Sequence, residues 1–258
     1  MEKVNVINSN GNTTNIIVND LLESALKFYG KEYEDVVIQT IRDTNFYEVS
    51  KHENINEVIT KILGRKSSSM SKNDTGCFLY PRNPEVEASY NDTVLYRIRG
   101  KKEAYVTLAH ELFGHAVCGK INRVVYKDNK KYNRNGLFLY GIDNNEIKNK
   151  ILNEGFADFI AELVVNDYGM KACLSESYKM AKESAKALYN YIGRENILKA
   201  LVLSQYDIER ELQERIGYDY FKDMSILNDE RYKYKIDSHY IKSHMYKQKI
   251  KNKLKKIA

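Results

Sequence analysis

Two histidines and a glutamate lie close together near the middle of the chain, in the run AHELFGH over residues 109–115. The flanking positions are mainly apolar, and polar groups rarely enter such surroundings without a partner. A divalent metal ion would supply that partner, because zinc binds neutral imidazole and carboxylate groups. We therefore predict that His110 and His115 bind a metal ion, with Glu111 beside them as the general base.

A catalytic zinc site uses three protein ligands and a water, so the two histidines require a third ligand. The run NEGFAD over residues 153–158 opens a largely apolar helical segment and offers two carboxylates four positions apart. At this spacing Glu154 and Asp158 share one helix face. We predict Glu154 as the third ligand and Asp158 as the acceptor of the free N–H of a ligating histidine, which fixes the tautomer of that ring.

The pattern His-Glu-x-x-His with a downstream Glu-x-x-x-Asp is typical of gluzincins, and this chain resembles it with one residue inserted between the histidines. The inserted form is similar to the motif of the dipeptidyl peptidase III family, whose second motif has a glutamate where this chain has Asn153. The resemblance is confined to these two motifs. It implies a zinc metallopeptidase with ligands His110, His115 and Glu154 and with Glu111 as catalytic base.

The spacing of the two histidines sets a condition on the helix that carries them. Successive residues of an α-helix rotate by about 100°, so His110 and His115 would differ by roughly 140° and would not face one ion. A π-helical turn absorbs the extra residue and returns both side chains to one side. We predict such a turn here, with Gly114 easing the distortion because glycine tolerates unusual dihedral angles.

In gluzincins a tyrosine or histidine of the helical lobe usually stabilises the oxyanion. Spacing does not select this residue among Tyr140, Tyr189, Tyr218 and His239, and Tyr218 and His239 serve as working candidates. By resemblance to gluzincins, the strand expected at residues 94–98 would border the cleft and hold a peptide substrate in extended form.

Composition and charge limit the alternatives. The 258 residues carry a formal charge of +6, but seven lysines lie in residues 242–258, which contain no acid, so the remainder carries 6 − 7 = −1. An anionic partner such as nucleic acid or a membrane surface is therefore expected only for this basic tail. Three widely spaced cysteines, no signal-peptide core and no membrane-spanning run favour a cytoplasmic protein.

The expected elements combine both kinds of secondary structure. We predict a hairpin around Asn10-Gly11, and a helix that opens at Asp20 and closes at Gly30. Further strands are expected at residues 36–41, 46–49 and 94–98. A connection is expected at 119–142, and helices are expected at 55–63, 103–118, 145–168, 171–192 and 195–216.

These elements predict an α+β, zincin-like fold with the active-site cleft between two lobes. The N-terminal lobe of strands and helices would cover residues 1–120, the helical lobe residues 121–241, and the basic tail residues 242–258. Peptide hydrolysis with one zinc ion is the favoured function.

Two alternatives stay open. Residues 108–116 also resemble metallopeptidase domains of bacterial toxins and injected effectors, which implies cleavage of one particular protein after delivery outside the cell. The second alternative is a binding module without catalysis. In that case the histidines are core residues, Glu154 and Asp158 balance a helix dipole, and the lysine tail binds the partner.

Overall fold

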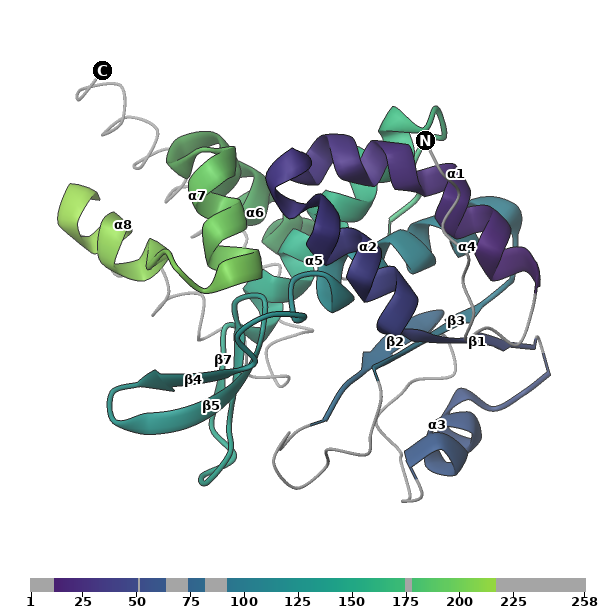
Figure 1. Cartoon of the computed structure of the whole chain (residues 1–258), viewed down its shortest axis with the longest axis horizontal. Coiled ribbons are helices and arrows are strands. Elements are labelled where there is room, and N and C mark those ends of the chain that lie inside the picture. The colour runs from purple at the N-terminus through teal and green to yellow at the C-terminus, as the bar shows by residue number, and fades with distance from the viewer. Residues whose placement is uncertain (1–11, 51, 64–73, 82–91, 175–177, 217–258) are drawn as a thin grey trace.

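The structure is a computed structural model that describes residues 12–50, 52–63, 74–81, 92–174 and 178–216. Helices and two small sheets alternate along this part of the chain, so the fold is mixed α+β, as predicted (Figure 1). The predicted Asn10-Gly11 turn lies outside the described residues. So do Tyr218, His239 and the basic tail 242–258.

Helix α1 (Asn12–Tyr29) forms because its apolar residues recur three and four positions apart. Its buried face consists of Ile17, Val18, Leu21, Leu22, Ala25, Phe28 and Tyr29. The second strand of the predicted hairpin, with Ile16 and Val18, is wrong, as is the helix start at Asp20. The alternation of two residues there is part of a longer helical period. A short 3-10 helix, η1 (Lys31–Tyr33), follows Gly30, whose φ is 82°.

Helix α2 (Glu34–Asp43) occupies the segment predicted as a strand over residues 36–41, so that prediction is wrong. Val37 and Ile41 are buried one helical turn apart, and Glu34 lies in the first turn, where a carboxylate interacts favourably with the helix dipole. The β-branched residues favour a strand by intrinsic propensity, but the burial of one helical face outweighs that preference.

Three strands form the first sheet, in the order β1 (Asn45–Val49), β3 (Thr93–Arg97) and β2 (Gly76–Leu79). β1 runs parallel to β3, and β2 runs antiparallel to it. Helix α3 (Ile55–Leu63) packs on one face of the sheet, against Val49 and Leu95. Phe46, Val94 and Tyr96 on the other face belong to the main core. The strands predicted at 46–49 and 94–98 and the helix predicted at 55–63 are confirmed.

The central helices carry the predicted site. Helix α4 (Lys101–Leu108) continues without interruption into the π-helix η2 (Ala109–Ala116), which packs against α5 (Lys150–Asp167). Helix α6 (Lys179–Ile192) packs on α5, and Gly155 permits this contact, because a Cβ there would lie 2.3 Å from the backbone of Ala181. These helices confirm the three helical segments predicted at 103–118, 145–168 and 171–192, but α5 and α6 begin later than predicted, at Lys150 and Lys179.

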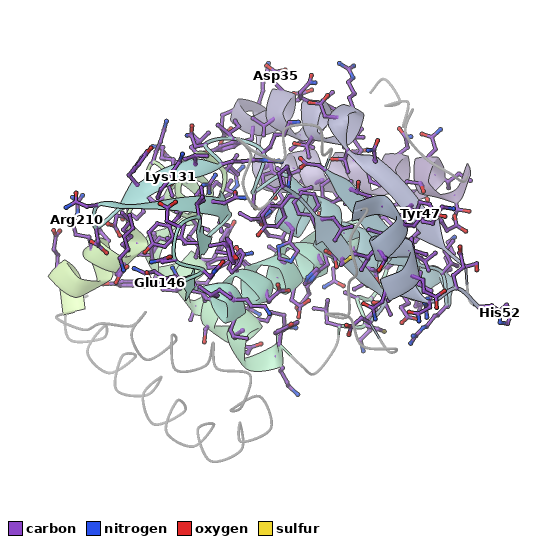
Figure 2. The ribbon with its side chains drawn as sticks, turned by 90° about the horizontal axis from the view of Figure 1, so that it is seen from below. Asp35, Tyr47, His52, Lys131, Glu146 and Arg210 are labelled. Carbon is purple, nitrogen blue, oxygen red and sulfur yellow. The ribbon has the colours of Figure 1, made fainter. Side chains whose placement is uncertain are left out.

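Three of the four strands of a second sheet lie in the segment predicted as a connection, so that prediction is wrong, and the fourth lies at the start of the helix predicted over 145–168. Its strands, in spatial order, are β4 (Val124–Lys127), β5 (Lys130–Asn135), β6 (Phe138–Gly141) and β7 (Ile147–Lys148). The β4–β5 hairpin turns through Asp128 and Asn129, both with positive φ, as in a type I′ turn. Lysine and asparagine are uncommon in strands, so the residue types of this segment did not predict a sheet. Lys131 on β5 and Glu146 just before β7 are labelled at the left of Figure 2 and mark the position of this sheet.

The segment predicted as one helix over 195–216 is divided. It contains α7 (Arg194–Leu198), the π-helix η4 (Lys199–Leu203) and α8 (Ile208–Ile216). Ser204, with a φ of 55°, ends η4 in the left-handed region and separates it from α8.

Arg134 on β5 joins the second sheet to the helices. Arg134 is 1% exposed. Its guanidinium donates to main-chain carbonyls in the segment just after η2 and in the last turn of η4. The closest acceptors are the carbonyls of Ile121 at 2.6 Å, Leu201 at 2.8 Å, Gly136 at 2.8 Å and Val202 at 2.9 Å. The second sheet, the segment that follows η2, and η4 are therefore held by one buried cation.

The main apolar core extends from Ile17 in α1 to Ile208 in α8 and so includes residues on both sides of position 120. The division of the chain at that position stays a prediction. Within the described residues no helix is both long enough and apolar enough to cross a lipid bilayer. All three cysteines are free thiols, and Cys118 is buried.

Candidate metal centre

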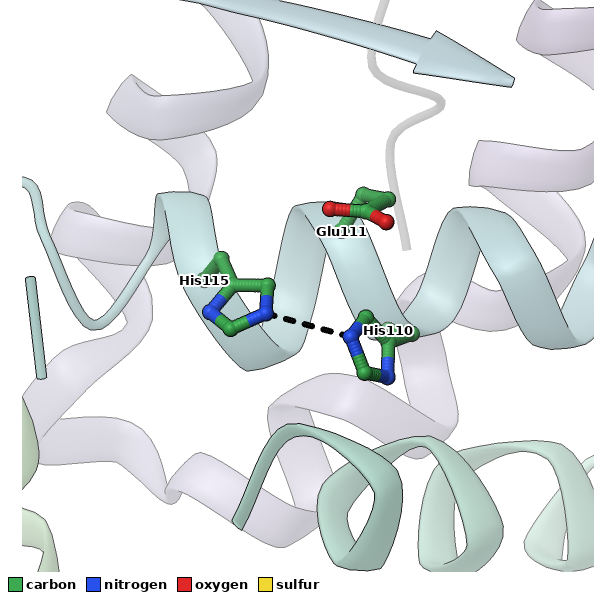
Figure 3. A group of neighbouring side chains, drawn as sticks. All are labelled: His110, Glu111 and His115. Carbon is green, nitrogen blue, oxygen red and sulfur yellow. Dashed lines mark hydrogen bonds between the residues drawn. The ribbon is translucent and has the colours of Figure 1, made fainter. Parts of the chain in front are cut away.

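The π-helix predicted from the histidine spacing is present. At the end of η2, the N–H of Val117 donates to the carbonyl of Leu112, five residues earlier, at 3.0 Å. Residues five apart in such a turn lie one above the other. The imidazoles of His110 and His115 therefore lie on one side of the helix, with ring centroids 4.8 Å apart and ring planes at 73° (Figure 3).

Three side-chain atoms from two helices converge at this place. Nε2 of His110 lies 3.1 Å from Nε2 of His115. Oε2 of Glu154, from the first turns of α5, lies 3.3 Å from Nε2 of His110 and 3.4 Å from Nε2 of His115. The structure thus brings together the three residues that the sequence pointed to as metal ligands.

The triangle of these atoms has the dimensions of a zinc coordination sphere. A tetrahedral zinc ion with bonds of about 2.0–2.1 Å sets its ligand atoms roughly 3.3 Å apart. The side chains of His110, His115 and Glu154 are 13%, 9% and 20% exposed, so the triangle is largely buried but open on one side. An open fourth position is what a catalytic zinc site requires, and the donor set fits zinc.

Glu111 offers a second carboxylate close to the histidines. One ligand atom each of His110, Glu111 and His115 lie within 4.8 Å of one another. This group is looser than the triangle with Glu154, in which no edge exceeds 3.4 Å. The histidines and Glu154 therefore form the tighter of the two candidate sites for a metal ion. Glu111 is 7% exposed and lines the adjoining cleft, and its carboxylate accepts no hydrogen bond from any described residue.

Neighbouring charges shift the pKa values of these groups. Burial lowers the pKa of His110, but its hydrogen bonds to Asp158 and Glu154 outweigh burial and raise that pKa well above its usual value. Burial raises the pKa of Glu154, but His115 and His110 lower it to a greater extent. Burial also raises the pKa of Glu111, against the opposing effect of the two histidines. A metal ion binds the deprotonated forms of imidazole and carboxylate groups, so it would compete with protons for these side chains.

Two further side chains fix the orientation of the imidazoles. Oδ1 of Asp158 lies 2.8 Å from Nδ1 of His110, which is the contact predicted for Asp158. The side-chain nitrogen of Asn153 lies 3.2 Å from Nδ1 of His115, while its oxygen accepts the N–H of Leu137 at 2.9 Å. Asp158 thereby directs Nε2 of His110 toward Glu154. The amide nitrogen of Asn153 can only donate to Nδ1 of His115, which places the proton of a neutral His115 ring on Nε2, so metal binding through this Nε2 requires the Asn153 contact to rearrange.

Replacing Asp158 by Asn is expected to weaken zinc binding by about 10- to 100-fold, because the charge that orients and polarises His110 is lost. Competition with a chromogenic chelator measures the change. Asp167→Asn is the matched control, because Asp167 lies on the same helix and pairs with Lys27 at the surface. Equal zinc affinity in the two variants would contradict the role of Asp158.

Gly114 has a different function from the one predicted. Its φ does not lie in the left-handed region, so the π turn does not require a glycine for its dihedral angles. A Cβ at this position would lie 2.6 Å from both Cα and Cβ of Ala157 on α5. Gly114 therefore allows the close approach of η2 to α5, and this approach brings Glu154 within reach of the histidines.

The triangle opens into a cleft of about 1000 Å³. Its lining includes residues 74–78, which contain part of β2, together with Phe138 and Leu174. The prediction that residues 94–98 border the cleft is wrong, because β3 is the central strand and has β1 and β2 on its two sides. The edge strand β2 lies at the cleft instead.

The predicted oxyanion candidates that are described do not line this cleft. Tyr140 donates to Asn145, next to the second sheet, and Tyr189 packs against Phe28 and Phe159. The cleft is lined instead by Tyr178, which was not among the predicted candidates. Burial raises the pKa of Tyr178, and the nearby carboxylates of Glu154 and Asp158 raise it further.

No local signal in the sequence identifies Tyr178. Its position depends on the packing of α6 on α5.

Comparisons with protein-family models, with curated proteins and with solved structures find no match for this chain. The function is therefore inferred from the geometry and the chemistry of the site.

Proposed function

We propose that the protein is a zinc-dependent peptidase. The observation that carries this proposal is the triangle of two imidazole nitrogens and one carboxylate oxygen with edges of 3.1, 3.3 and 3.4 Å. Its spacing fits a tetrahedral ion, and it has a second carboxylate, Glu111, beside it and a cleft in front of it. Histidine and carboxylate ligands with an open position are the donor set of hydrolytic zinc sites.

The proposed architecture is zincin-like. The first sheet and the helix formed by α4 and η2 would make the upper lobe, and α5 and the helices after it the lower lobe. A peptide would bind in extended form along the edge strand β2, with main-chain hydrogen bonds to the strand.

In this proposal the chain's own residues divide the work. Bound zinc would lower the pKa of a water toward neutrality and polarise the scissile carbonyl. His110, His115 and Glu154 would hold the ion, and Asp158 would orient His110. Glu111 would accept the proton of the attacking water and return it to the amine that leaves. Tyr178 would donate a hydrogen bond to the developing oxyanion.

Replacing His115 by Ala is expected to reduce the zinc content from about one ion per chain to nearly none, because two ligands of a tetrahedral site do not retain zinc against a chelator. Elemental analysis after dialysis measures the change. His52→Ala is the control, because His52 is exposed and lies at the periphery of the molecule (Figure 2). Parent protein without zinc, or equal content in both variants, would contradict the proposal.

A further inference from the structure

The change from π-helix to the following turn leaves one carbonyl of the metal-site helix without a backbone donor. The N–H of Val117 donates to Leu112, five residues back, and the N–H of Gly119 donates to His115, four residues back. Only one N–H, that of Cys118, lies between these two donors, but two carbonyls, those of Phe113 and Gly114, lie between the two acceptors. At least one of the two carbonyls must therefore find a donor elsewhere.

Tyr29 supplies a hydrogen-bond donor to one of these two carbonyls. Its hydroxyl, from the last residue of α1, donates to the carbonyl oxygen of Phe113. Tyr29 is 0% exposed, so no water replaces this contact, and the Phe28 ring lies nearly perpendicular to it at a centroid distance of 5.0 Å. The thiol of Cys118, a weak donor, lies 3.9 Å from the same oxygen.

We propose that Tyr29 is a positioning residue for the metal centre, because its hydroxyl bonds the carbonyl that the π turn releases and so holds His110 and His115 in one direction. In a regular α-helix each carbonyl accepts the N–H four residues later, and the two histidines would diverge. A buried carbonyl without a donor is costly, so loss of the hydroxyl favours the α-helical register over the π turn. This inference rests on the proposed zinc site.

The test compares Tyr29→Phe with Tyr96→Phe. Tyr96 is also fully buried, and its hydroxyl also contacts α1, through Thr14 at 2.6 Å, but it lies on β3. Two quantities are measured in each variant. The first is the zinc dissociation constant, from chelator competition. The second is the hydrogen exchange of the amides of residues 112–119 in metal-free protein, relative to the global stability from urea unfolding.

We expect Tyr29→Phe to weaken zinc binding about tenfold and to speed the exchange of these amides by a similar factor, which corresponds to one lost hydrogen bond to a buried carbonyl. Tyr96→Phe is expected to change neither quantity after correction for stability. Any result in which the two variants behave alike overturns the inference, as does faster exchange with unchanged zinc affinity. Parent protein that binds no zinc overturns the proposed function and, with it, the positioning role. The exchange measurement then still shows whether Tyr29 holds the π turn.

Discussion

Glu111→Gln is expected to lower kcat/KM for peptide hydrolysis roughly a thousandfold while the zinc content stays at about one ion per chain. Glutamine keeps the shape of the side chain but is not a base. Activity and zinc binding should respond differently to this substitution, because Glu111 lies outside the triangle that would hold the ion. Loss of the carboxylate therefore removes proton transfer and leaves the ligands in place.

The measurement uses a mixed-sequence peptide library, with cleavage products identified by mass spectrometry and zinc determined on the same samples. Glu57→Gln is the matched control, since Glu57 is an exposed residue of α3 that does not line the cleft. A Glu111→Gln protein that cleaves peptides as fast as the parent would disprove the assigned role. A protein that loses zinc as well would place Glu111 among the ligands.

The ligand triangle could be predicted from the sequence because the information is local. His110 and His115 lie within one helical segment, and helical geometry alone shows that an interval of five residues requires a π turn to serve one ion. Glu154 and Asp158 lie at an interval of four residues on one helix face. The contact between the helix of the histidines and the helix of Glu154 had to be assumed, and in the structure η2 and α5 do pack together.

The remainder of the site depends on contacts between distant segments. Tyr29 reaches the carbonyl of Phe113 across 84 positions in the sequence, and nothing near Tyr29 indicates this contact. Gly114 was expected to supply flexibility, but it supplies space for Ala157, and only the packed helices show the difference. Tyr178 enters the cleft because α6 packs on α5.

The fold predictions failed where local propensity and burial disagree. The segment of α2 contains β-branched residues that favour a strand, yet Val37 and Ile41 form one buried helical face. The second sheet is rich in lysine and asparagine, and its strands are defined by the Asp128–Asn129 turn and by Arg134 rather than by an apolar alternation.

Arg134→Met is expected to lower the free energy of unfolding by about 3 kcal/mol or more. Methionine has a similar length and removes the cost of burying a cation, which is visible in the lowered Arg134 pKa of about 10. It donates no hydrogen bond, however. The carbonyls of Ile121, Gly136, Leu201 and Val202, all within 2.9 Å of the guanidinium, would lose this donor.

In Arg134→Met, the loss of hydrogen bonds to the carbonyls outweighs the gain from no longer burying a cation. Each buried carbonyl left without a donor costs about 1–3 kcal/mol, so the loss of several such contacts exceeds the gain from removing one charge that is already well hydrogen-bonded. Urea unfolding followed by circular dichroism measures the difference. Arg210→Met on α8 is the control, because Arg210 is exposed and its ion pair is with Glu214 one turn away. This substitution should change stability by no more than about 0.5 kcal/mol.

The same substitution is expected to affect the proposed metal centre as well. Arg134 also contacts the carbonyl of Cys118, three residues after His115, so its loss should loosen the end of the helix that carries both histidines. We expect zinc to raise the unfolding midpoint of Arg134→Met less than that of the parent, because a loosened π turn binds zinc more weakly. An Arg134→Met protein as stable as Arg210→Met, with an unchanged response to zinc, would show that the carbonyls find other donors and that the buried cation does not support the site.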